Sequence, residues 1–410
     1  MERELDVVLE LDGSDVVVGR LWARARSNRE SASFEYTAAW LARPGAFALD
    51  PELPLAQGRT HTERPLFNAF TDPAPDRWGQ TLMRRNERAR AKAEGRAPRT
   101  LLTSDFLTLV DDATRLGALR FREAGTQLFL TVGGGIPPLV QLPKLLRASA
   151  AVVADEETDD DLALLLAPGT SLGGARPKAS IRRPDGTLAI AKFPSQDDEW
   201  PVTRWEATTL AMAKAAGIAV PRFELATILK KPVLIVDRFD RTGRRRIPYI
   251  SAMTALAARD GDQRSYLEIA DVLRSGGHDT RAQLAQLWRR IVFNVLVSNT
   301  DDHLRNHGFL RAADGWALSP AFDLNPMPAD VRPRVHALAL DEADPTASLE
   351  TVKAIAKSFG LSGPNATSIV AEVAAVTRRW KSFAQKHGLS ARDSERMESA
   401  FEHADAKAAR

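Results

Sequence analysis

The sequence predicts an α+β protein in which an N-terminal α/β subdomain precedes a β-rich small lobe and an all-helical large lobe. Residues 4–22 hold two alternating apolar runs around Asp12-Gly13-Ser14, which are the residue types of a tight turn. Several short runs of β-branched residues follow, and from residue 263 the apolar residues recur with helical spacing. The expected divisions are 1–125 for the subdomain, 126–257 for the small lobe and 258–410 for the large lobe.

The composition is that of an ordinary globular protein. The 410 residues are 44% hydrophobic and 27% charged, with 56 basic against 53 acidic residues. The resulting pI near 9.2 permits contact with nucleic acid but does not require it. The absence of cysteine excludes disulfides, thiolate catalysis and cysteine metal sites, and it fits a reducing compartment. The charged start MERELD and the short apolar runs predict a cytoplasmic protein with no membrane partner.

Along the first two regions the local pattern alternates between strands and links. A Pro/Gly-rich stretch follows residue 22, and a charged helix is expected near 76–95. The small lobe begins with a Gly/Pro-rich link and an acidic run from Asp155 to Asp161. Its expected strands are KASIRR, TLAIAKF, FELATIL and VLIVDRF.

The best-defined element is a helix that ends in a dense group of polar residues. Its apolar positions recur at i, i+3, i+4, i+7, i+8, i+11 and i+12, which predicts one buried stripe. These positions are Leu284, Leu287, Trp288, Ile291, Val292, Val295 and Leu296. The polar group runs from Ser298 to His307, and the β-like runs HGFLR and GWALSP then predict a hairpin. A further acid, Asp323, follows Asp301 by 323 − 301 = 22 residues.

This order of polar residues suits phosphoryl transfer. That reaction needs a carboxylate beside the acceptor hydroxyl, and an amide oxygen and a second carboxylate that hold Mg²⁺ against the phosphates. Asp301 and Asn306 are five residues apart, as the catalytic Asp and metal-binding Asn are in protein kinases, and Asp323 is the expected second metal ligand. The alternative is that these are ordinary turn or helix-end residues.

Upstream residues fit the nucleotide side of a kinase. Gly173 and Gly174 precede a strand in GTSLGGARPKAS, so their backbone N–H groups could bind phosphate, although the Walker pattern is not satisfied. Lys192 lies among apolar strand residues, where it either grips phosphates or snorkels at an edge. Glu206 is the candidate helix partner of Lys192, but with Thr203 it also reads as a capping box.

Taken together the parts occur in the order found in kinases. A Gly-rich loop, a strand lysine, a helix glutamate and a linker strand come first, followed by the catalytic Asp, the Asn and the metal Asp. Such an order is harder to obtain by chance than any single motif. It predicts a protein-kinase-like two-lobed fold.

The chain resembles the HipA-type serine/threonine kinases, the toxins of bacterial type II toxin–antitoxin pairs. The core signature of that family is NxDxHxKNxxFL, and residues 299–310 read NTDDHLRNHGFL, with arginine in place of the lysine. Other matches span nearly the whole chain. They are the S-x-G-G-x-x-P-K loop at 171–178, DRFDR at 237–241, PAFDL at 320–324, PGAFALDPELPL at 44–55 and TDPAPDRWGQTL at 71–82.

The resemblance implies ATP and Mg²⁺ as cofactors and assigns roles to residues. Asp301 is implied as the catalytic base, Asn306 and Asp323 as the Mg²⁺ ligands, and Lys192 as the phosphate-binding lysine with Glu206 as its candidate partner. The remaining implied residues are Asp237 and Phe239 at the adenine, Lys178 with Gly173 and Gly174 in the phosphate loop, Ser171 as an autophosphorylated serine, and His303 as a structural hydrogen-bonder.

The resemblance also implies partners. A DNA-binding HipB-like antitoxin is expected, so DNA contact by this chain would be indirect or non-specific. The substrate is expected to be a protein, and some relatives modify an aminoacyl-tRNA synthetase. Phosphorylation of Ser171 would place about two negative charges in the phosphate loop, so it is expected to switch the enzyme off.

Two rival interpretations and three departures accompany this reading. Arg305 replaces a lysine, Asp237 a glutamate, and Asp302 a residue that is often glycine, but none of these removes a catalytic group. One rival is a hydrolytic metal site on His303 and His307, which lacks the glutamate of H-E-x-x-H. The other is a catalytically weak or inactive binding module in a transcriptional repressor complex.

Overall fold

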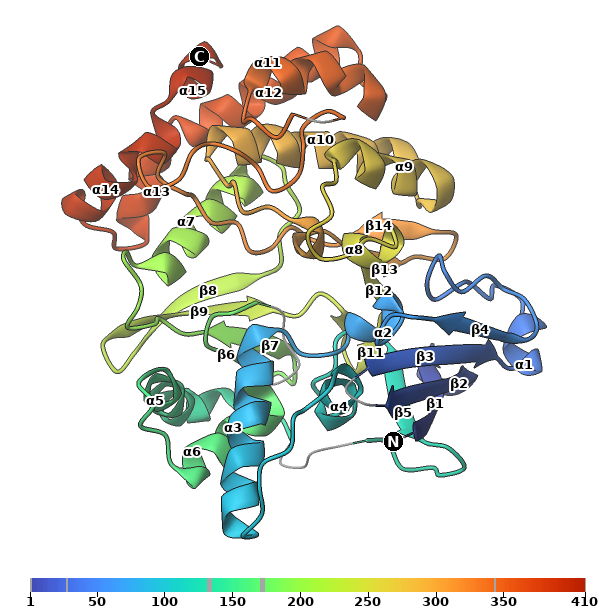
Figure 1. Ribbon diagram of the computed structural model, residues 1–410. Coiled ribbons are helices and arrows are strands. Elements are labelled where there is room, and N and C mark those ends of the chain that lie inside the picture. Colours follow the sequence, from blue (N-terminus) through green and yellow to red (C-terminus); the bar gives the residue numbers. More distant parts are fainter. Residues whose placement is uncertain (1, 27–28, 131–134, 170–173, 343, 410) are drawn as a thin grey trace. The chain divides into compact units, whose positions relative to one another are not determined.

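The chain folds into two compact units, each with its own core (Figure 1). The computed structural model describes residues 2–26, 29–130, 135–169, 174–342 and 344–409. Unit 1 comprises Met1–Asp197 and Thr227–Ile250, and unit 2 comprises Asp198–Ala226 and Ser251–Arg410. Most strands belong to unit 1 and most helices to unit 2, which confirms the α+β prediction.

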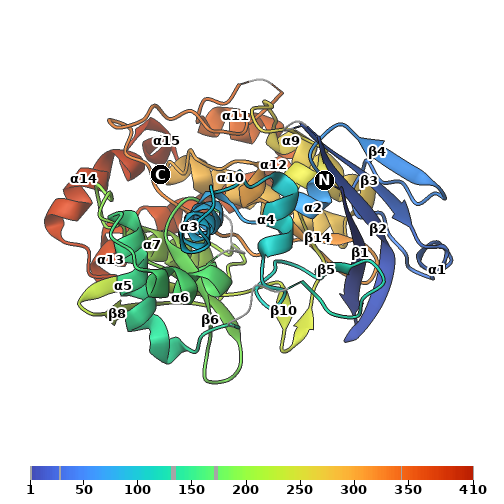
Figure 2. The ribbon, with the colours of Figure 1, turned by 60° about the horizontal axis from the view of Figure 1, so that its bottom comes forward.

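An antiparallel sheet of five strands forms the N-terminal part of unit 1, and Figure 2 gives a second view of it. Its order is β4-β3-β2-β1-β5. The strands are β1 (Glu2–Leu11), β2 (Ser14–Arg26), β3 (Arg29–Tyr36), β4 (Arg59–Thr62) and β5 (Leu119–Glu123). The predicted turn joins β1 to β2, and both of its residues, Asp12 at φ 52° and Gly13 at φ 80°, have the positive φ that such a tight loop requires.

The apolar face of this sheet forms a core with short helices. These are α1 (Ala38–Leu41), α2 (Asn68–Thr71) and α4 (Thr103–Leu109). Phe34, Phe70 and Phe121 are buried together, and Phe70 contacts the other two rings at centroid distances of 5.3 Å and 6.0 Å. Aromatic side chains bury large areas, so this cluster supplies much of the stability of the subdomain.

The rest of unit 1 surrounds a second antiparallel sheet. Its strands include β6 (Lys178–Arg182), β7 (Leu188–Lys192) and β9 (Lys231–Asp237), with β7 between the other two. β8 (Phe223–Ile228) runs across the boundary between the units. Three short strands follow β9 in the chain. They are β10 (Arg241–Thr242), β11 (Arg245–Arg246) and β12 (Tyr249–Ser251).

Helices occupy a stretch where the sequence suggested only a link and an acidic run. They are the 3-10 turn η1 (Leu139–Gln141), α5 (Leu142–Val153) and α6 (Asp159–Gly169). Asp159, Asp160 and Asp161 at the end of the acidic run form the first turn of α6, where negative charge is favourable beside the helix N-terminus. α6 packs against α3 (Arg77–Ala93), the predicted charged helix (Figures 1 and 2). A Cβ on Gly169 would lie only 2.6 Å from Leu82 Cδ1, so glycine permits this close approach.

Unit 2 is mainly helical. Its helices are α7 (Val202–Ala215), α8 (Ala252–Ala255), α9 (Tyr266–Gly276), α10 (Thr280–Leu296), α11 (Leu349–Ala354), α12 (Gly363–Thr377), α13 (Trp380–Lys386), α14 (Ala391–Phe401) and α15 (Ala404–Ala408). Two 3-10 turns, η2 (Leu304–Asn306) and η3 (Ile355–Phe359), join them. Trp205 of α7 packs against Trp380 and Phe401, whose rings stack at 4.6 Å, so α7 belongs to the core of this unit.

Unit 2 is not wholly helical, however. Strands β13 (Gly308–Arg311) and β14 (Trp316–Leu318) pair antiparallel, as the runs HGFLR and GWALSP predicted. The description of this lobe as all-helical is therefore wrong in this detail. Among the described residues, no helix has the length and apolar character needed to cross a membrane.

Candidate active site

The helix α10 carries the polar group of the sequence at its C-terminal end. All seven residues of its predicted stripe are buried, which confirms the interpretation of a packed amphipathic helix. The helix ends at Leu296, and Ser298 follows in the left-handed region at φ 51°. That conformation turns the chain sharply out of the helix. Residues 298–307, the catalytic loop, begin here on a rigid support.

Asp302 of the catalytic loop is 2% exposed and is held by several hydrogen bonds. One oxygen of its carboxylate, Oδ2, receives three contacts at hydrogen-bonding distance. They come from Tyr266 Oη at 2.6 Å, Asn294 Nδ2 at 2.7 Å and His307 Nε2 at 2.8 Å. Burial alone would raise the pKa of Asp302, but His307 and Tyr266 outweigh it and hold that pKa below its usual range. Asp302 is therefore a buried anion, and its departure from the family signature is fully accommodated.

A chain of side-chain amides extends from Asp302 toward Asp323. Asn299 Nδ2 donates to Asn294 Oδ1 at 3.1 Å, and the backbone N–H of Asn325 donates to Asn299 Oδ1 at 3.3 Å. Asn294 and Asn299 are each 1% exposed, so these bonds form away from water, where a missing partner is costly. The polar group after α10 thus joins the catalytic loop to the segment that carries Asp323.

Asp301, by contrast, points into solvent. Its side chain is 63% exposed, and its Oδ1 lies 3.3 Å from Nη1 of Arg332. Asn306 Nδ2 donates to the backbone carbonyl of Asp301 at 3.1 Å. The carboxylate of Asp301 is therefore accessible to an acceptor hydroxyl, while its backbone is fixed by Asn306.

Asp323 and its neighbours offer oxygen atoms that fit Mg²⁺. Asp323 adopts a left-handed conformation at φ 56°, which is uncommon for an aspartate, and Thr209 of α7 fixes the next residue by donating to the Leu324 carbonyl at 2.5 Å. Asn325 Nδ2 donates to Asp323 Oδ1 at 3.3 Å, and the buried Asn325 Oδ1 has no hydrogen-bond partner among the described residues. Asn306 donates through its nitrogen, and none of the hydrogen bonds among the described residues uses its Oδ1. Carboxylate and amide oxygens are the ligands that Mg²⁺ prefers.

The two histidines of the catalytic loop do not form a metal pair. His307 is 3% exposed and bound to Asp302, whereas His303 is exposed. Within the described residues, no group of three or more His, Cys, Asp or Glu side chains is arranged to hold a metal ion. Within the described residues His307 therefore acts as a structural hydrogen-bonder of the loop, and the same role expected of the exposed His303 stays a prediction.

In unit 1 the predicted phosphate-binding residues lie at the start of β6 and the end of β7. Lys178 and Lys192 are directly opposite each other in the antiparallel register of these strands. Like charges on cross-strand neighbours are destabilising unless an anion or acid lies between them. Gly174 has φ 94°, a conformation that favours glycine, and a Cβ there would lie 2.5 Å from Lys178 Nζ and would displace that ammonium group. Ser171 and Gly173 lie outside the described residues.

The start of α3 holds this loop in place, which sequence reasoning missed. The N–H of Gly174 donates to Asp76 Oδ2 at 2.6 Å, so this amide is already used and not left for phosphate. The Trp78 indole donates to the Lys178 carbonyl at 2.9 Å. No local pattern could have found these contacts, because about 100 residues separate the partners.

Glu206 lies on α7 and is 4% exposed. The helix begins at Val202 without a side-chain cap, so Thr203 is inside the helix and the alternative of a capping box does not hold. The buried position of Glu206 is compatible with a partner role, which remains a prediction. In the structure this helix belongs to unit 2, while Lys192 belongs to unit 1.

The DRFDR motif has a structural function beyond the one expected of Asp237 and Phe239. Arg183 Nε donates to Asp237 at 2.6 Å, and the ring of Phe239 lies 6.1 Å from that of Tyr249. Within the same motif Arg238 and Asp240 form a buried ion pair at 2.6 Å. Burial would raise the pKa of Asp240, but Arg238 and Arg241 lower it well below its usual range. Arg238 also donates to the carbonyls of residues 114 and 115, which ties this strand end to the N-terminal subdomain.

The comparisons with known proteins agree with this geometry. The family described as HipA-like C-terminal domain matches residues 170–380, which is 211 of 410 residues, and the family described as HipA N-terminal domain matches residues 9–103. Two curated proteins of Sinorhizobium fredii, named "Putative kinase Y4dM" and "Putative kinase Y4mE", are 29% and 26% identical over 33% and 38% of the chain. The matches span 36% and 41% of the length of these two relatives.

A solved structure matches nearly the whole fold. It is the HipA of the Shewanella oneidensis MR-1 toxin–antitoxin complex of HipA, HipB and operator DNA. The TM-score is 0.66 at 17% identity, over 97% of this chain and 94% of that one. The fold is thus the kinase-like two-lobed α+β fold of HipA. With a family match over more than half its length, the chain belongs to the HipA family.

Proposed function

We propose that this HipA-family chain is an ATP- and Mg²⁺-dependent serine/threonine protein kinase. The observation that carries the proposal is the buried polar chain from Asp302 to Asn325, because it fixes the Asp301–Asn306 loop relative to the segment of Asp323. An accessible carboxylate and a set of oxygen ligands held to one another are what phosphoryl transfer requires. The opposed pair of Lys178 and Lys192 gives further support as a phosphate site.

Each of these residues would have its own role in phosphoryl transfer. Lys178 and Lys192 bind phosphate oxygens of ATP, and Asn306 with Asp323 holds Mg²⁺. When bound, Mg²⁺ neutralises charge on the phosphates. Asp301 would orient the acceptor hydroxyl and accept its proton as the oxygen attacks the γ-phosphate, while the bond from the γ-phosphorus to the β-phosphate oxygen breaks and ADP leaves.

The test compares three Asp→Asn variants of the full chain. Asp323→Asn and Asp301→Asn should each lower phosphoryl transfer by about 100-fold or more, since one removes a metal ligand and the other the base. Asp260→Asn is the matched control, because Asp260 is an exposed acid that pairs with Arg305 of the same loop. Transfer of labelled phosphate from ATP to the chain itself and to lysate proteins is the measurement.

The variants also separate the two roles. Asp301→Asn should retain nucleotide binding. Asp323→Asn should lose the phosphoryl transfer that depends on Mg²⁺, so adding Mg²⁺ should no longer raise its activity. Activity within a few-fold of the wild type in either variant would contradict the assignment. Complete absence of ATP turnover in the wild type would instead favour an inactive binding module.

We further propose that a HipB-like antitoxin binds this chain and contributes the DNA specificity. Support comes from the similar fold of HipA in its complex with HipB and operator DNA. The substrate is proposed to be a protein, with aminoacyl-tRNA synthetases as first candidates. Co-purification of the chain with the product of a neighbouring gene, followed by operator binding with and without the chain, tests the partner.

Ser171 is proposed as the site of self-inactivation. A phosphate there would repel ATP phosphates at the opposed lysines, so ATP affinity should fall. Incubation with Mg²⁺ and ATP should add one phosphate to the peptide containing residues 170–176, and Ser171→Ala should prevent it. A phosphorylated chain with unchanged ATP affinity would contradict self-inactivation while leaving the kinase assignment intact.

A further inference from the structure

The segment of residues 325–337, called here the docking segment, follows Asp323 and contains no helix or strand of its own. The catalytic loop fixes both of its ends. The N–H of Met327 donates to the Ser298 carbonyl at 3.0 Å, and the N–H of Ala337 donates to the Thr300 carbonyl at 3.0 Å. Because the catalytic loop is itself bonded into the core, this segment has a defined path across the site.

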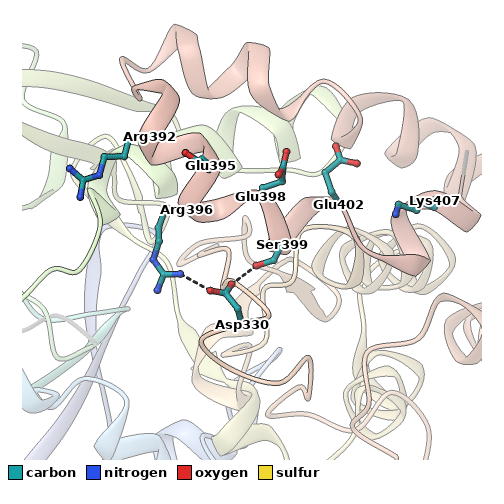
Figure 3. Close-up of a pocket in the computed structure, with 8 residues that line it drawn as sticks. All are labelled: Asp330, Arg392, Glu395, Arg396, Glu398, Ser399, Glu402 and Lys407. Atoms are coloured by element: carbon teal, nitrogen blue, oxygen red, sulfur yellow. Dashed lines mark hydrogen bonds and ion pairs between the residues drawn. The ribbon is translucent and has the colours of Figure 1, made fainter.

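A clamp on α14 holds the middle of the docking segment, as Figure 3 shows. Asp330 accepts hydrogen bonds from Arg396 Nη1 at 2.7 Å and Ser399 Oγ at 2.6 Å. Ser399 Oγ accepts a further bond from the N–H of Ala329 at 3.0 Å. The clamp lies beside an open pocket lined by Asp330, Arg392, Glu395, Arg396, Glu398, Ser399, Glu402 and Lys407. That pocket mixes both signs of charge and indicates no ligand.

Four residues further on, Arg334 forms a second anchor. Its guanidinium donates to the Val295 carbonyl at 2.8 Å, to Ser298 Oγ at 3.0 Å and to Asp405 at 2.6 Å. Each of the three guanidinium nitrogen atoms of Arg334 thus donates one hydrogen bond, so this side chain is held in place. The backbone on both sides of residue 332 is therefore restrained.

Arg332 lies between the two anchors and behaves differently from them. Its side chain is 55% exposed, and the one ion pair it forms within the described part of the chain is with Asp301 at 3.3 Å. Exposed pairs of this kind are weak and are exchanged easily for another partner. Arg332 therefore combines a restrained backbone with an exposed guanidinium that is only weakly paired with the candidate base. A substrate that approaches Asp301 meets this guanidinium.

The pair must open during turnover. An acceptor hydroxyl has to approach the Asp301 carboxylate, and the guanidinium of Arg332 occupies Oδ1, one of the two oxygen atoms that could receive that hydroxyl. A substrate that brings its own anion would give Arg332 a new partner as Asp301 is released. A neutral substrate would offer the guanidinium no new partner in exchange for Asp301.

We propose, on the basis of the kinase assignment above, that Arg332 is a specificity-determining residue that selects acceptor serines or threonines flanked by an anionic side chain. The anion exchanges with Asp301 on the guanidinium and leaves the base open to the hydroxyl. A carboxylate and a phosphorylated side chain share the chemistry that an arginine fork binds, so both sources satisfy the mechanism. The reach of one arginine side chain limits the anion to a few residues from the acceptor.

A peptide panel tests the proposal with the full-length protein. Serine peptides carry Glu, Gln, Lys or phosphoserine at each of the three positions on either side of the acceptor. At one or more positions the wild type should use Glu over Gln by about tenfold in kcat/KM, the effect of one charge-assisted hydrogen bond. Arg332→Gln should lose this preference because its kcat/KM on the Gln peptide rises toward that on the Glu peptide, and Arg332→Glu should shift the preference toward Lys.

Arg305→Gln is the matched control, since Arg305 is another exposed arginine of the site but is paired with Asp260. It should keep the preference for Glu.

Equal use of Glu and Gln by the wild type, or an unchanged preference in Arg332→Gln, would overturn the proposal. Self-phosphorylation without transfer to any peptide would overturn it as well, and the kinase assignment would survive all three results. Loss of both self-phosphorylation and peptide phosphorylation would overturn the kinase assignment together with this proposal. A higher rate on phosphoserine than on Glu peptides would support the proposal and identify phosphate as the preferred anion.

Discussion

Acid should destabilise unit 2 through His336, which the folded chain buries as a neutral imidazole. The side chain is 3% exposed, and neither ring nitrogen has a hydrogen-bond partner among the described residues. The ring of Tyr266 lies edge-on at 6.5 Å. Burial lowers the pKa of His336 from 6.5 to about 4; nearby Asp302 opposes this shift and Arg334 adds to it. Protonation in the folded state would leave a buried cation with two unpaired donors.

The sign and the magnitude follow from this pKa. Because the pKa in the folded state lies below that in the unfolded state, the unfolded chain binds the proton first as the pH falls. The stabilisation from a neutral His336 is complete above pH 6.5 and is lost between pH 6.5 and pH 4. The difference of 6.5 − 4 = 2.5 units corresponds to about 3 kcal/mol, of which about 2 kcal/mol is lost by pH 5.

The assay compares the wild type with His336→Phe, which keeps an aromatic ring against Tyr266 but cannot titrate. Urea unfolding midpoints of both proteins are measured between pH 7.5 and pH 4.5. The wild type should lose stability faster than the variant by the amounts above. His403, whose pKa burial also lowers to about 4, remains in both proteins and cancels in the difference. His303→Gln, which changes an exposed imidazole, should follow the wild type.

Parallel pH curves for the wild type and His336→Phe would refute this reasoning. So would a nuclear magnetic resonance titration in which the ring of His336, assigned by its absence from the variant, titrates near pH 6.5.

Three further outcomes follow from two buried acids and from one glycine with a positive φ. Asp302→Asn should lower the unfolding midpoint in urea by the equivalent of about 2–4 kcal/mol and should reduce kcat more than the KM for ATP, because the lost anion orients the catalytic loop. Asp240→Asn leaves buried arginines uncompensated, so unit 1 should lose about 3–5 kcal/mol, measured by hydrogen exchange of peptides from residues 114–123; unchanged protection there would contradict this account. Gly174→Ala should cost about 1–3 kcal/mol and weaken ATP binding measured by calorimetry, because the new methyl group displaces the Lys178 ammonium.

Much of the architecture could be predicted because its signals are local. The stripe of α10, the turn at Asp12-Gly13 and the hairpin after the catalytic loop all depend on spacing over fewer than about 20 residues. α5 and α6 were missed although α5 has apolar residues at helical spacing, because the neighbouring Gly/Pro stretch and the acidic run suggested a link. An acidic run is as suitable for the first turn of a helix as for a solvated loop.

The candidate site could be predicted only in part, for a different physical reason. The spacing of Asp301 and Asn306 is local, but the partners of Asp302 are up to 36 residues away, and the pattern gave no reason to choose His307 over His303. Arg332 reaches Asp301 across 31 residues from a segment without any motif. Contacts of this kind depend on tertiary packing, which no spacing rule encodes.

The amide chain behind the catalytic loop has a direction. Asn299 must donate with its nitrogen to Asn294 and accept with its oxygen from Asn325, so an aspartate at position 299 would place oxygen against oxygen. A change at Asn299 can be compensated only at Asn294, because the third link is a backbone N–H that always donates, so relatives should exchange residues 294 and 299 together. The paired pattern N-x4-N-x2-D with D-x-N about 20 residues later is consequently a search key. It should find proteins with this hydrogen-bonded chain of amides even where the surrounding sequence has diverged.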